Sequence, residues 1–195
     1  SDPVAITTLM QQSALLPPGQ SLRSVLGSDY AAIAERSNAA GLDLAVMDRF
    51  APWFVALLLL QIEITERGFD AAHGIEQQVT ELAVADRKPI TGLETPARQF
   101  AILGGLSMPD QKRFLLMTLE ESEQADAQLD MLLDAWRRGD AAALARTLSA
   151  EFEDFPQLYR PLTEDRNRAW VGEIEELLDE RDDYLVVVGA LHLVG

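Results

Sequence analysis

The sequence contains no cysteine, which excludes disulfides, thiolate metal sites and a cysteine nucleophile. Basic residues are also scarce, with 16 Lys and Arg against 32 Asp and Glu and a net charge of −16. This excess of acid argues against nucleic acid or an anionic membrane as a partner. The longest apolar run, Ala51–Leu60, contains Pro52 and is half the length that a membrane-spanning helix needs, so we expect no membrane span.

What the sequence does contain is enough apolar residue, 48% of 195 positions, for one domain with a packed core. Apolar residues at helical spacing cover most of the sequence. We expect Gly41 and Gly139 to end helices, Pro52 to lie in a first helical turn and Asp140 to cap a helix. The expected helices are Val4–Leu15, a helix capped by Ser28 and running through Ala39, a short one from Asp43, Trp53–Arg67, Ala71–Asp86 capped by Asp70, one from Pro96, Pro109–Arg138, Ala141–Ala150 and Thr163–Arg181. Phe155–Pro161 has the composition of a turn, and the three tryptophans, Trp53, Trp136 and Trp170, are interpreted as core residues.

Two short apolar segments, Pro89–Leu93 and Tyr184–Val188, predict strands buried on both faces, as in a parallel sheet covered by helices. Two strands buried in this way do not make a stable sheet by themselves. We therefore predict an α/β fold with a mainly parallel sheet, of which this chain holds only the later strands, and with a large helical insertion.

Histidine is scarce as well, because the sequence contains only His73 and His192. His192 follows Gly189 in a Gly-x-x-His pattern directly after the second predicted strand, where ligands collect in open α/β sheets. A neutral imidazole at that position could bind a divalent metal, although a lone histidine is as often a structural residue. Glu94, at the end of the other predicted strand, is equally well explained as a site acid or as a residue at the start of the next helix. His73 is interpreted as structural.

Several motifs in order resemble the TraB/GumN family, whose relatives include the Tiki metalloproteases. They are the helix opened by Pro52-Trp53, the Gly92–Thr95 segment with Gln99, the Trp136–Asp140 turn, the Asp165–Trp170 block and the Gly189–His192 motif. The family's first Gly-x-x-His and a strand ending in glutamate have no counterpart here, and Glu76 stands where the family has aspartate. By this resemblance we expect 1–195 to be a single TraB/GumN-like domain truncated at both ends.

The resemblance implies a metal-dependent hydrolase, most plausibly a peptidase that acts on peptides or proteins. His192 would be one ligand of a divalent transition metal of the Mn, Co or Zn class, which would be held only together with the missing N-terminal segment. Arg166, Asn167 and Glu94 would be the catalytic and supporting groups. On the residues alone, Arg166 and Asn167 fit an ordinary helix with salt bridges to Glu164, Asp165 or Glu173. A periplasmic or secreted location is implied rather than a cytoplasmic one.

Two other interpretations stay open. The chain could be a non-catalytic member of the same fold that binds a partner through its helices, for example through the acidic stretch Glu120–Asp130. It could also be a structural fragment without a complete site. If His192 does belong to a site, the charged turn Arg181–Asp183 should fold the last segment back along the final helix and bring His192 close to Arg166 or Asn167.

Overall fold

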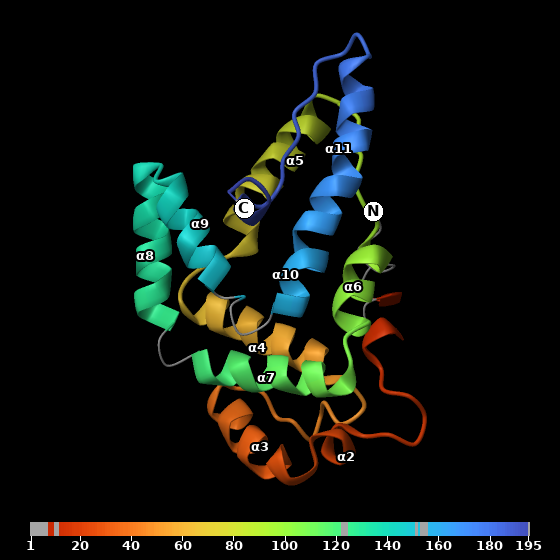
Figure 1. The fold of residues 1–195 in the computed structure, drawn as a ribbon, viewed down its shortest axis with the longest axis vertical. Coiled ribbons are helices and arrows are strands. Elements are labelled where there is room, and N and C mark those ends of the chain that lie inside the picture. The colour runs from red at the N-terminus through yellow and green to blue at the C-terminus, as the bar shows by residue number, and fades with distance from the viewer. Residues whose placement is uncertain (1–7, 10–11, 122–124, 151, 153–155, 195) are drawn as a thin grey trace. The chain divides into compact units, whose positions relative to one another are not determined.

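The computed structural model describes residues 8–9, 12–121, 125–150, 152 and 156–194. Residue contacts group the chain into two compact units, Ser1–Glu123 and Gln124–Gly195 (Figure 1). The single-domain expectation for 1–195 stays a prediction.

Among the described residues, the regular elements of the first unit are α2 (Leu22–Leu26), η1 (Gly27–Asp29), α3 (Tyr30–Ala39), α4 (Pro52–Glu66), η2 (Ala71–His73), α5 (Ile75–Ala85), α6 (Pro96–Gly104) and α7 (Met108–Glu121). Those of the second unit are α8 (Ala125–Arg138), α9 (Ala141–Ala150), α10 (Pro156–Leu162), α11 (Glu164–Leu178) and η3 (Ala190–His192).

The predicted α/β class is wrong. The structure is 69% helical, and the part of the chain that it describes contains no strand. Both predicted strands, Pro89–Leu93 and Tyr184–Val188, are irregular backbone, and Leu185 in the second is 76% exposed. An apolar run becomes a strand only when another strand supplies hydrogen bonds to its backbone, and within the described residues neither run has one.

The first unit is built around α4, whose first half is apolar on nearly every side and supplies the buried residues of the helix. Pro52 occupies its first turn, as the sequence predicts. Trp53 and Val55 are almost fully buried in a core that also takes Leu115 from α7 and Ile33 from α3. Each large apolar side chain buried here contributes about 1.5–3 kcal/mol, so α4 is the element on which this unit depends most.

Two cations of the first unit close the ends of neighbouring helices. The Arg36 Nη2 donates to the carbonyl of Leu119 at 2.8 Å, and the Lys112 Nζ donates to the carbonyl of Leu26 at 3.0 Å. Lys112 also contacts the Asp29 carboxylate at 2.5 Å, and this hydrogen bond lowers the pKa of Asp29. Both cations satisfy carbonyls that helix ends leave without a partner.

Helix boundaries follow the sequence prediction unevenly. The long helix expected over 109–138 is helical in α7 and α8, while its middle, residues 122–124, lies outside the described residues and interrupts the acidic stretch 120–130. Half of the helix expected over 4–15 lies outside them as well. The Phe155–Pro161 prediction of a turn is wrong, because Pro156–Leu162 forms α10. Asp70 caps η2 rather than α5, and Gly74 precedes α5.

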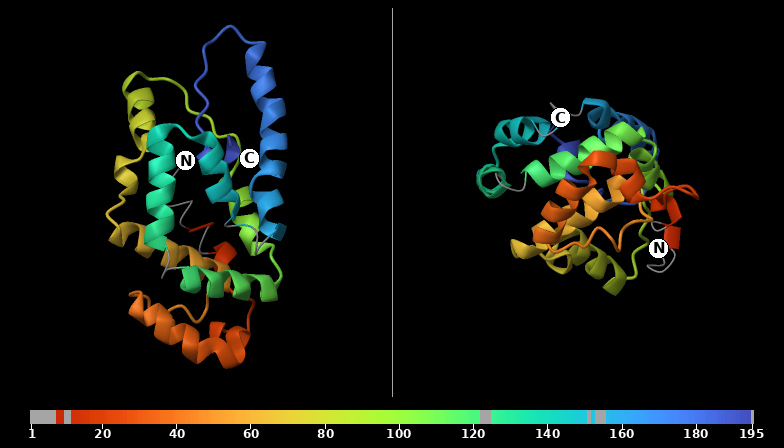
Figure 2. Two further views of the ribbon diagram at one scale, coloured as in Figure 1. Left: turned by 60° about the vertical axis from the view of Figure 1, so that its left-hand side comes forward. Right: turned by 90° about the horizontal axis from the view of Figure 1, so that it is seen from below.

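The second unit begins with a pair of helices, α8 and α9, joined by a tight turn (teal in Figure 2). Gly139 adopts a φ of 64° there, and the Asp140 Oδ1 accepts a hydrogen bond from the Ala143 amide at 2.9 Å. Both features were predicted. After α11 the chain turns and runs back beside that helix to η3 at the C-terminus (Figure 1). This return path, and not a sheet, positions the candidate site.

Candidate functional site

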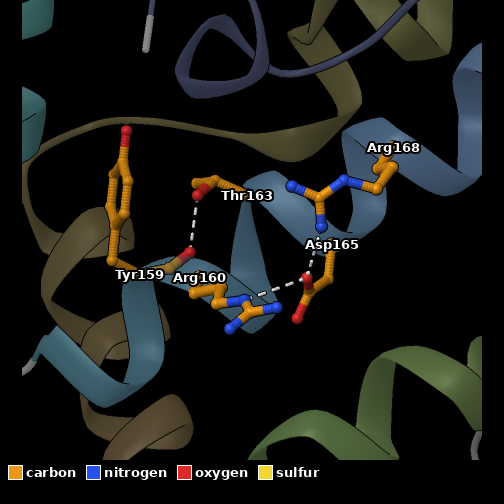
Figure 3. Close-up of polar contacts among 5 residues, drawn as sticks. All are labelled: Tyr159, Arg160, Thr163, Asp165 and Arg168. Carbon is orange, nitrogen blue, oxygen red and sulfur yellow. Dashed lines mark hydrogen bonds and ion pairs between the residues drawn. The ribbon is translucent and has the colours of Figure 1, made fainter.

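The start of α11 is fixed by Thr163, whose side chain is buried. Its Oγ1 donates to the carbonyl of Tyr159 in α10 at 2.5 Å (Figure 3). The carbonyl of Thr163 accepts from the Asn167 amide at 2.8 Å. Thr163 therefore connects the last turn of α10 to the first turn of α11. The residues that follow it, Arg166 and Asn167, are held at a defined position on the helix.

Two arginines at this junction converge on Asp165 (Figure 3). The Arg160 Nε and the Arg168 Nη1 each lie 3.2 Å from the Asp165 Oδ1. All three side chains are largely exposed, so each pair contributes about 1 kcal/mol or less. These salt bridges are made by Arg160 and Arg168 and secure the helix start, whereas the salt bridge predicted for Arg166 stays a prediction.

Asn167 makes two hydrogen bonds to His192 in η3. Its Nδ2 donates to the His192 carbonyl at 3.1 Å, and its Oδ1 lies 2.7 Å from the His192 Nδ1. A carbonyl can only accept, so the amide nitrogen must face it, and the amide oxygen must then face the ring. Because that oxygen is also an acceptor, Nδ1 carries the ring proton in the neutral imidazole and Nε2 carries the lone pair.

The His192 ring is packed against Trp170, one turn further along α11. The two ring centroids are 4.5 Å apart with an interplanar angle of 52°. The Arg166 Cζ lies 4.8 Å from the Trp170 ring centroid, within cation–π range, and the Arg166 Nη1 donates to the Leu162 carbonyl at 3.2 Å. Trp170 is 6% exposed, so one buried aromatic holds both the imidazole and the guanidinium in place.

The expected closeness of Asn167 and His192 is confirmed, whereas the expected setting is wrong. His192 is a half-buried residue of η3 and does not lie at the edge of a sheet. Gly189 has φ −62° and ψ 148°, which other residues adopt equally well, so the backbone there does not require glycine. Asn167 and His192 meet because the segment after α11 runs back along it.

A pocket of about 450 Å³ opens beside His192. Its walls come from α8 (Leu132, Leu133, Trp136), α9 (Leu144, Leu148) and the segment from Gly189 to His192. Trp53 and Trp170 are core residues as predicted, but Trp136 is not, because 61% of it is exposed. The sequence shows the apolar spacing of α8, but this spacing is the same for a core face and for a pocket wall.

Glu94 lies in the first unit, just before α6. The N-cap of α6 is Thr95, whose Oγ1 accepts from the Arg98 amide at 3.3 Å, so Glu94 is not the cap that the alternative interpretation suggested. Its half-buried carboxylate accepts from the Gln99 Nε2 at 2.9 Å. Arg166, Asn167 and His192 are brought together in the second unit, and Glu94 belongs to the other.

Comparison with known proteins identifies the family. The model of the TraB/PrgY/gumN family matches residues 1–195. The chain belongs to the TraB/PrgY/gumN family. The uncharacterized protein YbaP of Escherichia coli K12 is 31% identical over 144 residues, which are 73% of this chain and 52% of that protein. YbaP of Shigella flexneri gives the same values. The chain thus spans about half the length of these relatives, and no solved structure matches it.

The family match covers all the predicted site residues, and the second histidine of this TraB/PrgY/gumN protein, His73, lies in the first unit. The His73 side chain is 84% exposed, and its Nδ1 lies 3.3 Å from the Asp70 Oδ2 beside η2. Within the described residues, no three His, Cys, Asp or Glu side chains are grouped closely enough to hold a metal ion. No helix in those residues is long and apolar enough to cross a membrane.

Proposed function

We propose that this TraB/PrgY/gumN family member is a metal-dependent hydrolase of peptide bonds in which His192 supplies one metal ligand. The observation that carries the proposal is the double hydrogen bond from Asn167, which holds the ring proton on Nδ1 and directs the lone pair to Nε2. Histidines that bind metals characteristically donate the other ring N–H to a fixed acceptor in this way. Family membership supports the same assignment.

The donor chemistry at His192 suits a divalent transition metal of the Mn, Co or Zn class. A hydrolytic metal centre needs about three protein ligands, so the proposal requires further ligands from outside the described residues. When bound, such a metal would acidify a water molecule and polarise the scissile carbonyl. The described residues contribute the orientation of one imidazole and the charges around it.

Three residues have supporting roles in the proposal. Asn167 keeps the His192 imidazole in one tautomer and one orientation. Arg166, held against Trp170, would stabilise a substrate carbonyl, a carboxylate or a developing oxyanion through its guanidinium. Glu94 stays a predicted supporting acid, and its carboxylate accepts a hydrogen bond from the Gln99 Nε2 at 2.9 Å.

Peptide cleavage by the protein at its full natural length tests the proposal. Cleavage of a mixed peptide library, followed by mass spectrometry, should depend on added Mn²⁺, Co²⁺ or Zn²⁺ and stop with a chelator. His192→Ala should remove metal-dependent turnover, and Asn167→Leu should lower metal affinity or activity about 10–100-fold. His73→Ala is the matched control. The exposed His73 ring pairs with Asp70 and has no role in the proposal, so this variant should leave turnover unchanged.

Each variant needs a melting curve close to that of the unaltered protein, so that lost activity reflects the site. Cleavage that persists in His192→Ala, or in the presence of chelator, would show that the proposal is wrong.

A further inference from the structure

The pocket beside His192 lies inside the second unit, and its lining is almost entirely uncharged and apolar. Apart from His192, none of the residues that line it carries a titratable side chain. Trp136 contributes a wall although 61% of it is exposed, and an exposed large aromatic in a concave apolar site is typical of ligand binding. On α8, Asp134 and Arg138 pair with each other at 2.7 Å and do not line the pocket.

The size of the pocket limits what it can hold. About 450 Å³ is near the lower end of the roughly 300–1,000 Å³ found for small-molecule sites. That volume suits one bulky apolar side chain with its neighbouring amide groups. A charged group would lose its hydration there without gaining a partner of opposite charge.

The position of the pocket links it to the proposed chemistry. His192 lines the pocket and is also the residue that Asn167 and Trp170 hold in place. The chain from Gly189 to Leu191 forms the wall next to the imidazole. A side chain seated between α8, α9 and this wall would therefore place its own backbone close to His192.

We propose that this pocket binds a bulky apolar side chain of the peptide substrate and so selects peptides with such a residue next to the cleaved bond. This inference rests on the proposed function for the identity of the ligand as a substrate. The walls that set the preference are Trp136 and Leu132 of α8 and Leu148 of α9.

Binding is measured first, without catalysis, on the full-length protein by ligand-observed NMR. N-acetyl-phenylalanine amide and N-acetyl-leucine amide should bind about tenfold or more tightly than N-acetyl-alanine amide or N-acetyl-aspartate amide, as expected for an apolar pocket. Leu132→Trp should fill the pocket and remove this preference. Trp136→Ala, at an exposed position that the fold does not depend on, should weaken binding of the phenylalanine amide. Met131→Trp is the control, since Met131 is 56% exposed on α8 and does not line the pocket.

Cleavage preferences of the same proteins are measured next. Loss of the preference in both pocket variants, with retention in Met131→Trp, supports the inference. Equal binding of all four amides, or an unchanged preference in Leu132→Trp and Trp136→Ala, overturns it, as does a pocket filled by the protein's own chain. Selective binding without any hydrolysis would contradict the proposed function, whereas hydrolysis without a preference for apolar residues would contradict the pocket alone.

Discussion

At the scale of single residues, the side-chain amide of Asn167 determines how the His192 imidazole is held. Asn167 has one group that only donates and one that only accepts, and the His192 carbonyl decides which of them faces the imidazole. An aspartate in place of Asn167 could not make the same pair of contacts, because an ionised carboxylate has no donor for the His192 carbonyl. One side chain at the right register of α11 therefore fixes the tautomer of a residue that lies 25 positions later in the sequence.

In the segment between α11 and η3, the pKa of Tyr184 is strongly raised. Its hydroxyl donates to the Glu180 carboxylate, which raises the pKa of Tyr184 from 10.0 to about 12, with smaller contributions from desolvation and from the charges of Glu180 and Asp182. Ionisation of the phenol would lose this hydrogen bond and bring two negative charges together. The folded state therefore favours the neutral phenol.

We predict that Glu180→Gln lowers the pKa of Tyr184 toward 10, measured as a difference in the ultraviolet titration of tyrosine. The stabilisation from this contact is complete below pH 10 and is lost as the pH rises toward 12, because the folded-state pKa lies above the unfolded value. Glu176→Gln, in the last turn of α11, is the control and should leave the titration unchanged. Identical curves for Glu180→Gln and the unaltered protein would exclude the contact.

At the scale of elements, the helix ends that the sequence predicted correctly, such as that of α8, are set by local backbone geometry. Gly139 ends α8 with φ 64°, where a side chain is strained, and a Cβ added there would meet no atom within 4 Å. Gly172 lies in the interior of α11, and a Cβ there would also meet nothing within 4 Å. The two glycines thus differ in backbone conformation and not in the space around them.

We predict opposite effects for the same substitution at these two positions. Gly139→Ala should lower the free energy of unfolding by about 1–2 kcal/mol, the cost of a left-handed alanine. Gly172→Ala should raise it by about 0.5–1 kcal/mol, because alanine is the better helix former. Urea denaturation followed by circular dichroism measures both. Changes of the same sign would contradict the assigned backbone conformations.

At the scale of the whole molecule, the net charge of −16 is the dominant property. Like charges at this density repel one another in the compact state, and salt screens the repulsion. The Debye length falls from about 30 Å at 0.01 M to about 8 Å at 0.15 M ionic strength. The acidic surface should therefore cost the protein more stability in dilute buffer than near physiological salt.

We predict that the melting temperature rises between about 0.01 M and about 0.15 M sodium chloride. Potassium chloride should give the same rise, since screening depends on ionic strength and not on the cation. Calorimetry or circular dichroism measures the shift. A melting temperature that falls with salt would mean that attractive ion pairs, such as that of Lys112 with Asp29, outweigh the repulsion.

Among the proposed site residues, the family resemblance singled out Arg166, Asn167 and His192, and helix and segment lengths then predicted that His192 lies close to Arg166 or Asn167. When a tight charged turn follows a helix, the next segment must run back along that helix, so residues at similar distances from the turn lie close together. The same reasoning could not find the pocket. Whether Trp136 is covered depends on how α9 and the last segment pack against α8, and the periodicity of α8 does not contain that information.

By itself, the sequence determined the helical character of the protein, several of its helix ends and the residues of the family motifs. These features depend on contacts between residues a few positions apart, which local sequence specifies. Only the tertiary structure decided that 89–93 and 184–188 are not strands and that His192 lines an apolar pocket. A strand requires hydrogen bonds from a second segment, and a pocket requires walls from several elements, so both depend on how distant parts of the chain come together.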